Sequence, residues 1–224
     1  EVNLMKNLND NFVTNLTKQF SNYIEENNIS SSHEVSDLMR KLFNNIQESI
    51  VSGANVNQIT SPNIITEIID EINDPLKKSK YLRILGGAIL NDKSSFDRLK
   101  PQAESILTKS YAIAKENKYK IEQFKSALQY IRFLRTETKL DEALSFLQKE
   151  EQILKEIPDS DSLSYSCAMN KFLIYEEKHH IVSAYRELIL AGEIADRLQN
   201  KEKQQGVEEK LKNLFLKLEQ YEKA

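Results

Sequence analysis

The 224-residue sequence predicts an all-α fold, an antiparallel helix-pair solenoid that carries an N-terminal helical hairpin. Glycine and proline are scarce, with five and four residues, and the charged residues, 29% of the chain, are mostly lysine and glutamate. This composition leaves few turn residues for strands and favours helices throughout the chain. A repeated pattern of small and apolar residues then predicts that these helices stack in pairs.

The repeat has a period close to 40 residues. The same pattern occurs in three windows at spacings of 40 and 41 residues: Ala103, Leu107 and Ile113; Ala143, Leu147 and Ile153; Ala184, Leu188 and Ile194. The segments before the last two windows also match each other, with Phe124, Ala127, Ile131 and Leu134 against Tyr165, Ala168, Phe172 and Tyr175. A fixed period of this length that holds two helical segments is typical of helix-pair solenoids, which bind other molecules along an extended surface.

Apolar residues at steps of three and four predict the first helix over residues 3–26 and a second over 31–50. Ser31 and Glu34 form a capping box at the start of the second helix. A polar loop follows at residues 52–55, and we place the domain boundary there, with an N-terminal hairpin over 1–55 and the repeat region over 56–224.

Two shorter helices are predicted next, over residues 62–73 and 75–90. Ser61 and Asp74 are capping residues, each followed by a proline at the first helical position. Gly86 and Gly87 lie inside the second of these helices, where glycine costs about 1 kcal/mol relative to alanine. We expect close approach of a neighbouring helix to be the reason, with a kink or an early helix end as the alternative.

From residue 100 the repeat predicts helices over 101–116, 119–136, 139–156, 160–178, 181–198 and 202–222. The connections of two to four residues make consecutive helices antiparallel neighbours. Thr138 with Asp141, and Asp159 or Ser160, are candidate caps at two of the junctions. The last helix combines one apolar side with a polar remainder, as expected of the end unit of a solenoid.

The helix pairs resemble the longer, roughly 40-residue variety of the tetratricopeptide family. In that family the second helix carries a small residue followed four positions later by a large apolar one, as in Ala103/Leu107, Ala143/Leu147 and Ala184/Leu188. A further small residue three positions on is present as Ser110 and Ala191, whereas Glu150 departs from the pattern. The Trp-Leu-Gly opening of the first helix is absent. The resemblance covers residues 100–200 and implies a right-handed superhelix.

The resemblance also implies that the first helix of each pair lines the concave surface. On the helix at 119–136 this surface is a stripe of basic and apolar residues, and the helix at 160–178 supplies its continuation. We call the following seven residues the binding stripe: Lys125, Leu128, Arg132, Arg135, Met169, Asn170 and Leu173. Two arginines beside apolar side chains could hold a carboxylate of a peptide. The alternative is that long basic side chains only solvate the edge of a groove.

Charge is distributed unevenly, although the net charge is only −3. Residues 75–136 carry 14 basic and 5 acidic side chains, a net charge of +9, between acidic flanking segments. A nucleic acid could contact two basic clusters, but no nucleic-acid-binding motif accompanies them. The clusters are Lys77, Lys78, Lys80 and Arg83, with Tyr81 among them, and Lys115, Lys118 and Lys120. A solvated lysine-rich face is the simpler interpretation, so we expect protein or peptide rather than nucleic acid as partner.

No residue pattern in the chain predicts an enzyme, a cofactor or a metal site. His179 and His180 are adjacent on the chain, so they cannot both bind one metal comfortably, and we expect a solvated turn there. The single cysteine, Cys167, is expected to be a small buried thiol. One cysteine and no apolar run near 18 residues also favour a cytoplasmic protein without a membrane span.

The sequence therefore predicts a non-enzymatic scaffold that binds a protein or peptide on its concave face. The alternative is the sensor half of a bacterial peptide-responsive regulator of the quorum-sensing type. The start at Glu1 has the look of a fragment, which would allow a missing effector domain upstream. A homodimer through an apolar edge of the N-terminal hairpin is also compatible with the sequence.

Overall fold

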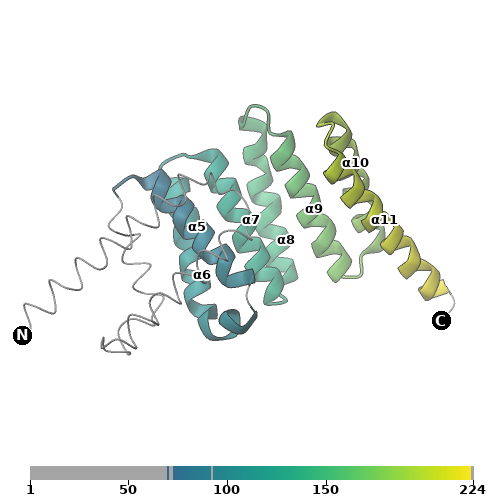
Figure 1. Cartoon of the computed structure of the whole chain (residues 1–224), viewed down its shortest axis with the longest axis horizontal. Helices are drawn as coiled ribbons and strands as arrows, with labels where there is room; N and C mark the ends of the chain where they lie inside the picture. Colours follow the sequence, from purple (N-terminus) through teal and green to yellow (C-terminus); the bar gives the residue numbers. More distant parts are fainter. Residues whose placement is uncertain (1–69, 71–72, 92, 223–224) are drawn as a thin grey trace, which may run out of the picture. The chain divides into compact units, whose positions relative to one another are not determined.

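The computed structural model describes residues 70, 73–91 and 93–222, and every regular element in this part of the chain is helical (Figure 1). The elements are α5 (Pro75–Asn91), α6 (Lys93–Glu116), α7 (Lys120–Thr136), α8 (Leu140–Glu151), the 3-10 helix η1 (Gln152–Glu156), α9 (Asp161–Glu177), α10 (Ile181–Arg197) and α11 (Lys201–Glu222). The predicted all-α class is thus confirmed for the described residues. The helices predicted over 3–26 and 31–50, the boundary at residue 55 and nearly all of the helix over 62–73 lie outside them.

Two predicted helix boundaries were wrong. Helix α6 begins at Lys93 rather than near 101, so Pro101 lies inside the helix. The segment predicted as one helix over 139–156 is α8 followed by the tighter η1. Asp74 does cap α5 as predicted, since its carboxylate accepts hydrogen bonds from the backbone N–H groups of Leu76 (2.9 Å) and Lys77 (3.3 Å).

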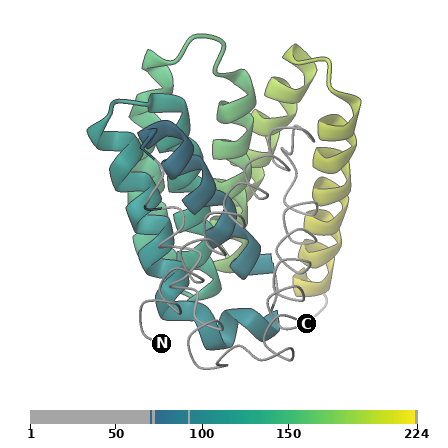
Figure 2. The same cartoon turned by 60° about the vertical axis from the view of Figure 1, so that its left-hand side comes forward.

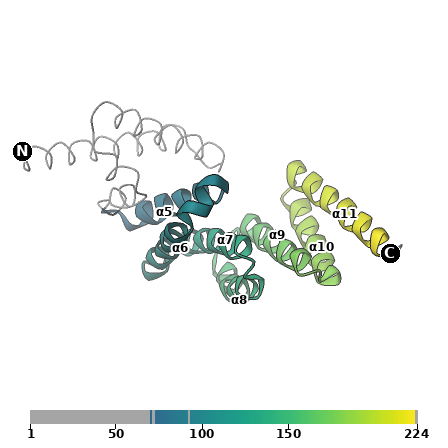
Figure 3. The same ribbon diagram turned by 90° about the horizontal axis from the view of Figure 1, so that it is seen from below.

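The chain forms two compact units, residues 1–122 and 123–224, and the division falls within α7. In the first unit α5 packs along α6. In the second unit α9 packs against α8 and α10, and α10 packs against α11 (Figures 2 and 3). Consecutive helices in the second unit are joined by short turns, as the spacing of the repeat predicted.

The alanine and leucine positions of the repeat lie in the core of both units. The alanine and leucine of each window are fully buried: Ala103, Leu107, Ala143, Leu147, Ala184 and Leu188. In the second unit Ala184, Leu188 and Ala191 of α10 pack with Ala168 and Phe172 of α9 and with Val207 of α11. The small residue of each window therefore lets the helices approach closely, while the leucine fills the space between them.

The helix pairs are connected by one recurrent turn. The residue after the turn donates its backbone N–H to a carbonyl five positions back at four junctions: Tyr119 to Ala114, Lys139 to Leu134, His180 to Tyr175 and Asn200 to Ala195. The residue that precedes each of these N–H donors has a positive φ. These residues are Lys118, Thr138, His179 and Gln199, and the φ of Thr138 is 57°. This is the Schellman motif, which usually places a glycine in the left-handed conformation. Thr138 therefore belongs to the turn that follows α7, and the side-chain caps expected of Thr138 and Ser160 for the following helices are absent.

Gly86 of α5 lies where α6 approaches most closely. An ideal Cβ built on Gly86 would stand 2.3 Å from Cδ2 and 2.5 Å from Cγ of Leu107, far inside van der Waals contact. Leu107 is fully buried and cannot swing out of the way. The close helix approach that the sequence predicted for the glycine pair is thus confirmed at Gly86.

Candidate binding surface on helices α7 and α9

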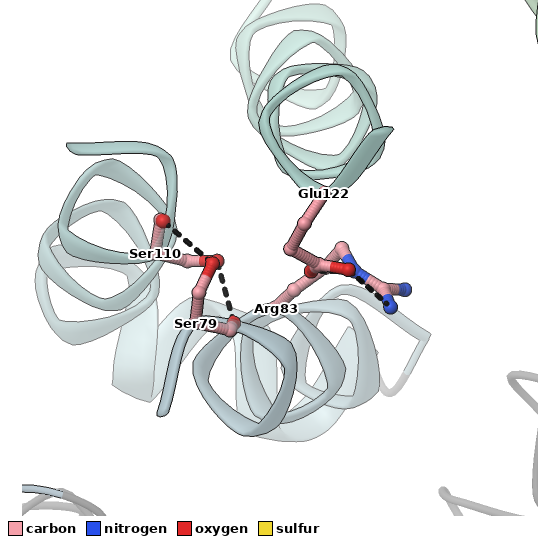
Figure 4. A network of polar contacts seen from close by, with 4 residues as sticks. All are labelled: Ser79, Arg83, Ser110 and Glu122. Atoms are coloured by element: carbon pink, nitrogen blue, oxygen red, sulfur yellow. Dashed lines mark hydrogen bonds and ion pairs between the residues drawn. The ribbon is translucent and has the colours of Figure 1, made fainter. Parts of the chain in front are cut away.

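Three ion pairs join alternate helices along the chain, α5 to α7, α7 to α9 and α9 to α11. Arg83 Nε of α5 contacts Glu122 Oε1 of α7 at 2.6 Å, and Glu122 is nearly inaccessible to solvent (Figure 4). Arg135 of α7 is paired with Glu177 of α9, and Lys217 Nζ of α11 contacts Glu176 Oε1 of α9 at 2.6 Å. The partners are 39, 42 and 41 residues apart, respectively, which is one period of the sequence repeat. Opposite charges one period apart are a signal that a scan of the sequence could have found.

The position three residues after the leucine of each window carries a polar residue in two of the three windows. The side chains of these two residues, Ser110 and Glu150, are hydrogen-bonded inside the fold. The hydroxyl of Ser110 donates to the carbonyl oxygen of Ser79 at 2.8 Å, and the Ser79 hydroxyl returns a bond to the Ser110 carbonyl (Figure 4). Glu150, which breaks the family pattern, is buried and accepts a 2.8 Å bond from the amide of Gln123. These groups are structural and are not available to a ligand.

On α7 the structure gives the four predicted stripe residues different environments. Lys125 is exposed, and Leu128 is half-buried. Arg132 is also half-buried, and its pKa is lowered from the usual arginine value, first because burial removes hydration and second because the charge of Arg135 lies nearby. Two guanidinium groups, one of them partly dehydrated, thus lie close together on this part of α7.

Arg135 has a structural role that the sequence interpretation did not include. Its side chain is only 16% exposed and pairs with Glu177 of α9. Its Nε atom is buried and has no hydrogen-bond partner. The guanidinium is therefore only partly satisfied by Glu177, and an unmade hydrogen bond to a buried donor costs about 1–3 kcal/mol.

Gln129 belongs to this surface, although the sequence interpretation did not single it out. It lies four residues after Lys125 and three before Arg132, so the three side chains share one side of α7. The carbonyl oxygen of its side chain is buried without a hydrogen-bond partner. An unsatisfied acceptor at Gln129 and an unsatisfied donor at Arg135 thus flank Arg132 on the same helix.

On α9 the three predicted residues are half-buried and lie at the edge of the core. Met169 and Leu173 pack against the cluster that α9 forms with α10 and α11. The side-chain amide of Asn170 donates a 2.8 Å bond to the carbonyl oxygen of Ser166 one turn earlier. Glu177, the partner of Arg135, lies one helical turn after Leu173, and this ion pair brings the end of the α7 stripe to α9.

A second group of charged residues lies among α8, α9 and α10. Lys171 Nζ contacts Glu151 Oε2 at 2.6 Å and Glu187 Oε1 at 4.0 Å. The pKa of Glu187 is raised, mainly by burial. The pKa of the buried thiol of Cys167, beside this group, is raised to about 12, again mainly by burial. The predicted burial of the Cys167 thiol is confirmed.

Other candidate sites of the sequence gain no support from the structure. Tyr81 is buried, so it cannot stack on a nucleic-acid base, and Arg83 is engaged by Glu122. His179 and His180 lie exposed at the turn before α10, as predicted. Among the described residues no group of three or more histidine, cysteine, aspartate or glutamate side chains could hold a metal ion. Nor does this part of the chain contain a helix with the length and hydrophobicity needed to cross a membrane.

Comparison with known proteins found no match for the chain. No protein-family description, no curated protein and no solved structure matches the chain.

Proposed function

We propose that the chain is a tetratricopeptide-like, non-enzymatic scaffold that binds a peptide, or an extended segment of a partner protein, on the side of α7 that carries Arg132. The proposal rests first on the sequence repeat, whose alanine and leucine positions are buried at each helix pair. Ion pairs one period apart between alternate helices, such as Arg135 with Glu177, agree with a regular stack. Stacks of this kind bind ligands along their inner helices rather than in a catalytic pocket.

The observation that supports binding at α7 most directly is the set of unmet polar groups around Arg132. The side-chain oxygen of Gln129 is a hydrogen-bond acceptor and Nε of Arg135 is a donor, and neither of these two atoms has a hydrogen-bond partner. A peptide backbone supplies one N–H and one C=O per residue, so it is matched to such a pair. Both residues are half-buried, so each lies at the boundary between the interior and the solvent.

The electrostatics select the kind of peptide. Arg132 and Arg135 repel each other, and partial burial removes water from Arg132. A carboxylate placed between them relieves both penalties and accepts charge-assisted hydrogen bonds. The half-buried Leu128 lies one helical turn before Arg132 and provides adjacent apolar surface. We therefore expect the ligand to carry an acidic residue next to an apolar one.

Selection of phage-displayed random peptides against the whole chain tests the proposal, followed by calorimetric titration of the selected peptides. Arg132→Gln should weaken binding at least about tenfold, because it removes charge-assisted hydrogen bonds worth about 1.5–3 kcal/mol. Arg132 is a better test residue than Arg135, whose replacement also removes the ion pair with Glu177.

Arg186→Gln, at an exposed arginine on α10, is the matched control and should leave the affinity unchanged. Circular dichroism should show the same helicity for both variants. The proposal fails if no peptide is enriched over an unrelated helical protein. It also fails if the Arg132→Gln chain binds the selected peptides as tightly as the wild type.

A further inference from the structure

Apolar surface is concentrated on the last two helices of the chain. Among the described residues seven large hydrophobic side chains are exposed, and six of them lie on α10 and α11: Val182, Tyr185, Ile189, Leu190, Phe215 and Leu216. The rings of Tyr185 and Phe215 are in contact, with centroids 6.1 Å apart, so the apolar surface is continuous from one helix to the other. Exposed apolar patches of this kind mark interaction sites.

The preceding helix pairs do not have this surface. The positions of Val182, Tyr185 and Ile189 in α10 correspond, 41 residues earlier in α8, to Asp141, Leu144 and Gln148. One further period earlier, in α6, they correspond to Pro101, Glu104 and Thr108. The apolar character of α10 on this side is therefore a property of the last pair and not of the repeat in general.

The position equivalent to Phe215 in the preceding helix pair packs against a neighbouring helix. Phe215 follows Tyr175 of α9 by 40 residues, which is also the distance between the first residues of α9 and α11. Tyr175 packs against the cluster that contains Ala184 and Leu188 of the following helix. Phe215, by contrast, is 50% exposed. Phe215 thus keeps the aromatic side chain of the earlier interface, whereas the positions of Ala168 and Phe172 correspond in α11 to the exposed Glu208 and Lys212.

The charges around Phe215 and Leu216 favour a second copy of α11 as the occupant of this surface. Lys212 and Glu219 are both exposed, and they lie on the same side of α11 as the two apolar residues. They are placed symmetrically about the midpoint between Phe215 and Leu216. An antiparallel copy of α11 centred on this midpoint would bring Phe215 to the partner's Leu216 and Lys212 to the partner's Glu219, each contact occurring twice.

We propose that two copies of the chain associate through this edge, with α11 antiparallel to its counterpart and with Val182 and Tyr185 of α10 at its flank. Such a two-fold interface requires a surface that is complementary to itself. Apolar residues at the centre and one charge of each sign at equal distances on either side meet this requirement. The contact is separate from the ligand surface proposed on α7.

Sedimentation velocity of the full chain over a range of concentrations tests the proposal. The wild type should show a monomer–dimer equilibrium. Phe215→Glu should raise the dimer dissociation constant at least about tenfold, because it buries an unpaired charge at the centre of the interface. Ile121→Glu is the matched control: Ile121 is also 50% exposed but lies on α7, and its replacement should leave the equilibrium unchanged.

A charge exchange tests the antiparallel register. Lys212→Glu should weaken the dimer about threefold or more at low salt, because it places like charges opposite each other. The double variant Lys212→Glu/Glu219→Lys should recover the wild-type constant. The proposal is overturned by a wild-type chain that remains monomeric at all concentrations, by a dimer that tolerates Phe215→Glu, or by a charge exchange that recovers nothing.

Discussion

At the scale of single residues, the packing of α5 on α6 in the first unit requires a glycine at position 86. Gly86 has no side chain, and the isobutyl group of Leu107 occupies the space that a Cβ would need. A glycine within a helix is usually a weakness, because alanine forms helices better by about 1 kcal/mol. Here the packing between α5 and α6 outweighs that preference.

Gly86→Ala should therefore destabilise the protein by about 1–3 kcal/mol, the usual cost of overpacking a filled core. Gly206→Ala is the matched control, since Gly206 also lies within a helix but a Cβ there would meet nothing closer than the Tyr165 hydroxyl at 3.9 Å. That control should stabilise the protein by about 1 kcal/mol. Urea denaturation of both variants measures the difference, and a stabilised Gly86→Ala chain would refute the close approach.

At the scale of the helices, the turns between them carry conformational strain. Lys118, Thr138, His179 and Gln199 all have a positive φ, and none is a glycine. The left-handed conformation costs a residue with a side chain roughly 1–2 kcal/mol, and the cost is highest for β-branched residues such as Thr138. The Schellman hydrogen bonds at each junction hold the chain in this conformation.

Thr138→Gly should accordingly stabilise the protein by about 0.5–1 kcal/mol, after allowance for the greater freedom of glycine in the unfolded chain. Thr136→Gly provides the comparison, because Thr136 is the last residue of α7 and has ordinary helical geometry. Its replacement should not stabilise the protein. Thermal unfolding of the two variants separates these outcomes, and a Thr138→Gly chain no more stable than the Thr136→Gly chain would show that the turn is unstrained.

Helix positions were largely predictable from the sequence, whereas the details of the turns were not. The repeated apolar positions fix where α7, α9, α10 and α11 lie to within one or two residues. The start of α6 was misplaced because Pro101 resembles a first helical residue. The left-handed turns were missed because no glycine marks them: the backbone hydrogen bonds that stabilise them depend on the path of the chain and not on residue type.

The sequence predicted which residues share the binding stripe, but not the contacts that each of them makes. Helical spacing alone placed Arg132 and Arg135 on one side of α7, but it could not reveal that Arg135 is paired with Glu177 across to α9. Nor could it show that Gln129 and Arg135 have buried atoms without partners, because burial depends on the packing of neighbouring helices. The structural role of Arg135 in the fold was therefore visible only in the structure.

At the scale of the whole molecule, charges one period apart connect helices that are not consecutive in the chain. If Arg135 mainly connects α7 to α9, its contribution to stability should require an opposite charge at position 177, whichever of the two residues carries the positive charge. Arg135→Glu should destabilise the protein by up to about 1 kcal/mol, because it leaves two carboxylates facing each other. The exchange Arg135→Glu/Glu177→Arg should restore most of that loss in a double-mutant cycle.

The same exchange separates stability from ligand binding. It restores the ion pair between α7 and α9 but removes positive charge from the neighbourhood of Arg132, so peptides selected by the wild type should remain weakly bound while the unfolding temperature recovers. Replacement of Arg197, which pairs with Asp161 at an exposed position, provides the control and should change stability by less than about 0.5 kcal/mol and binding not at all. If the exchange recovers both properties, Arg135 acts only through Glu177 and the ligand surface rests on Arg132 and Gln129. If the exchange recovers neither property, the packing of α7 on α9 depends on further charged residues near this ion pair.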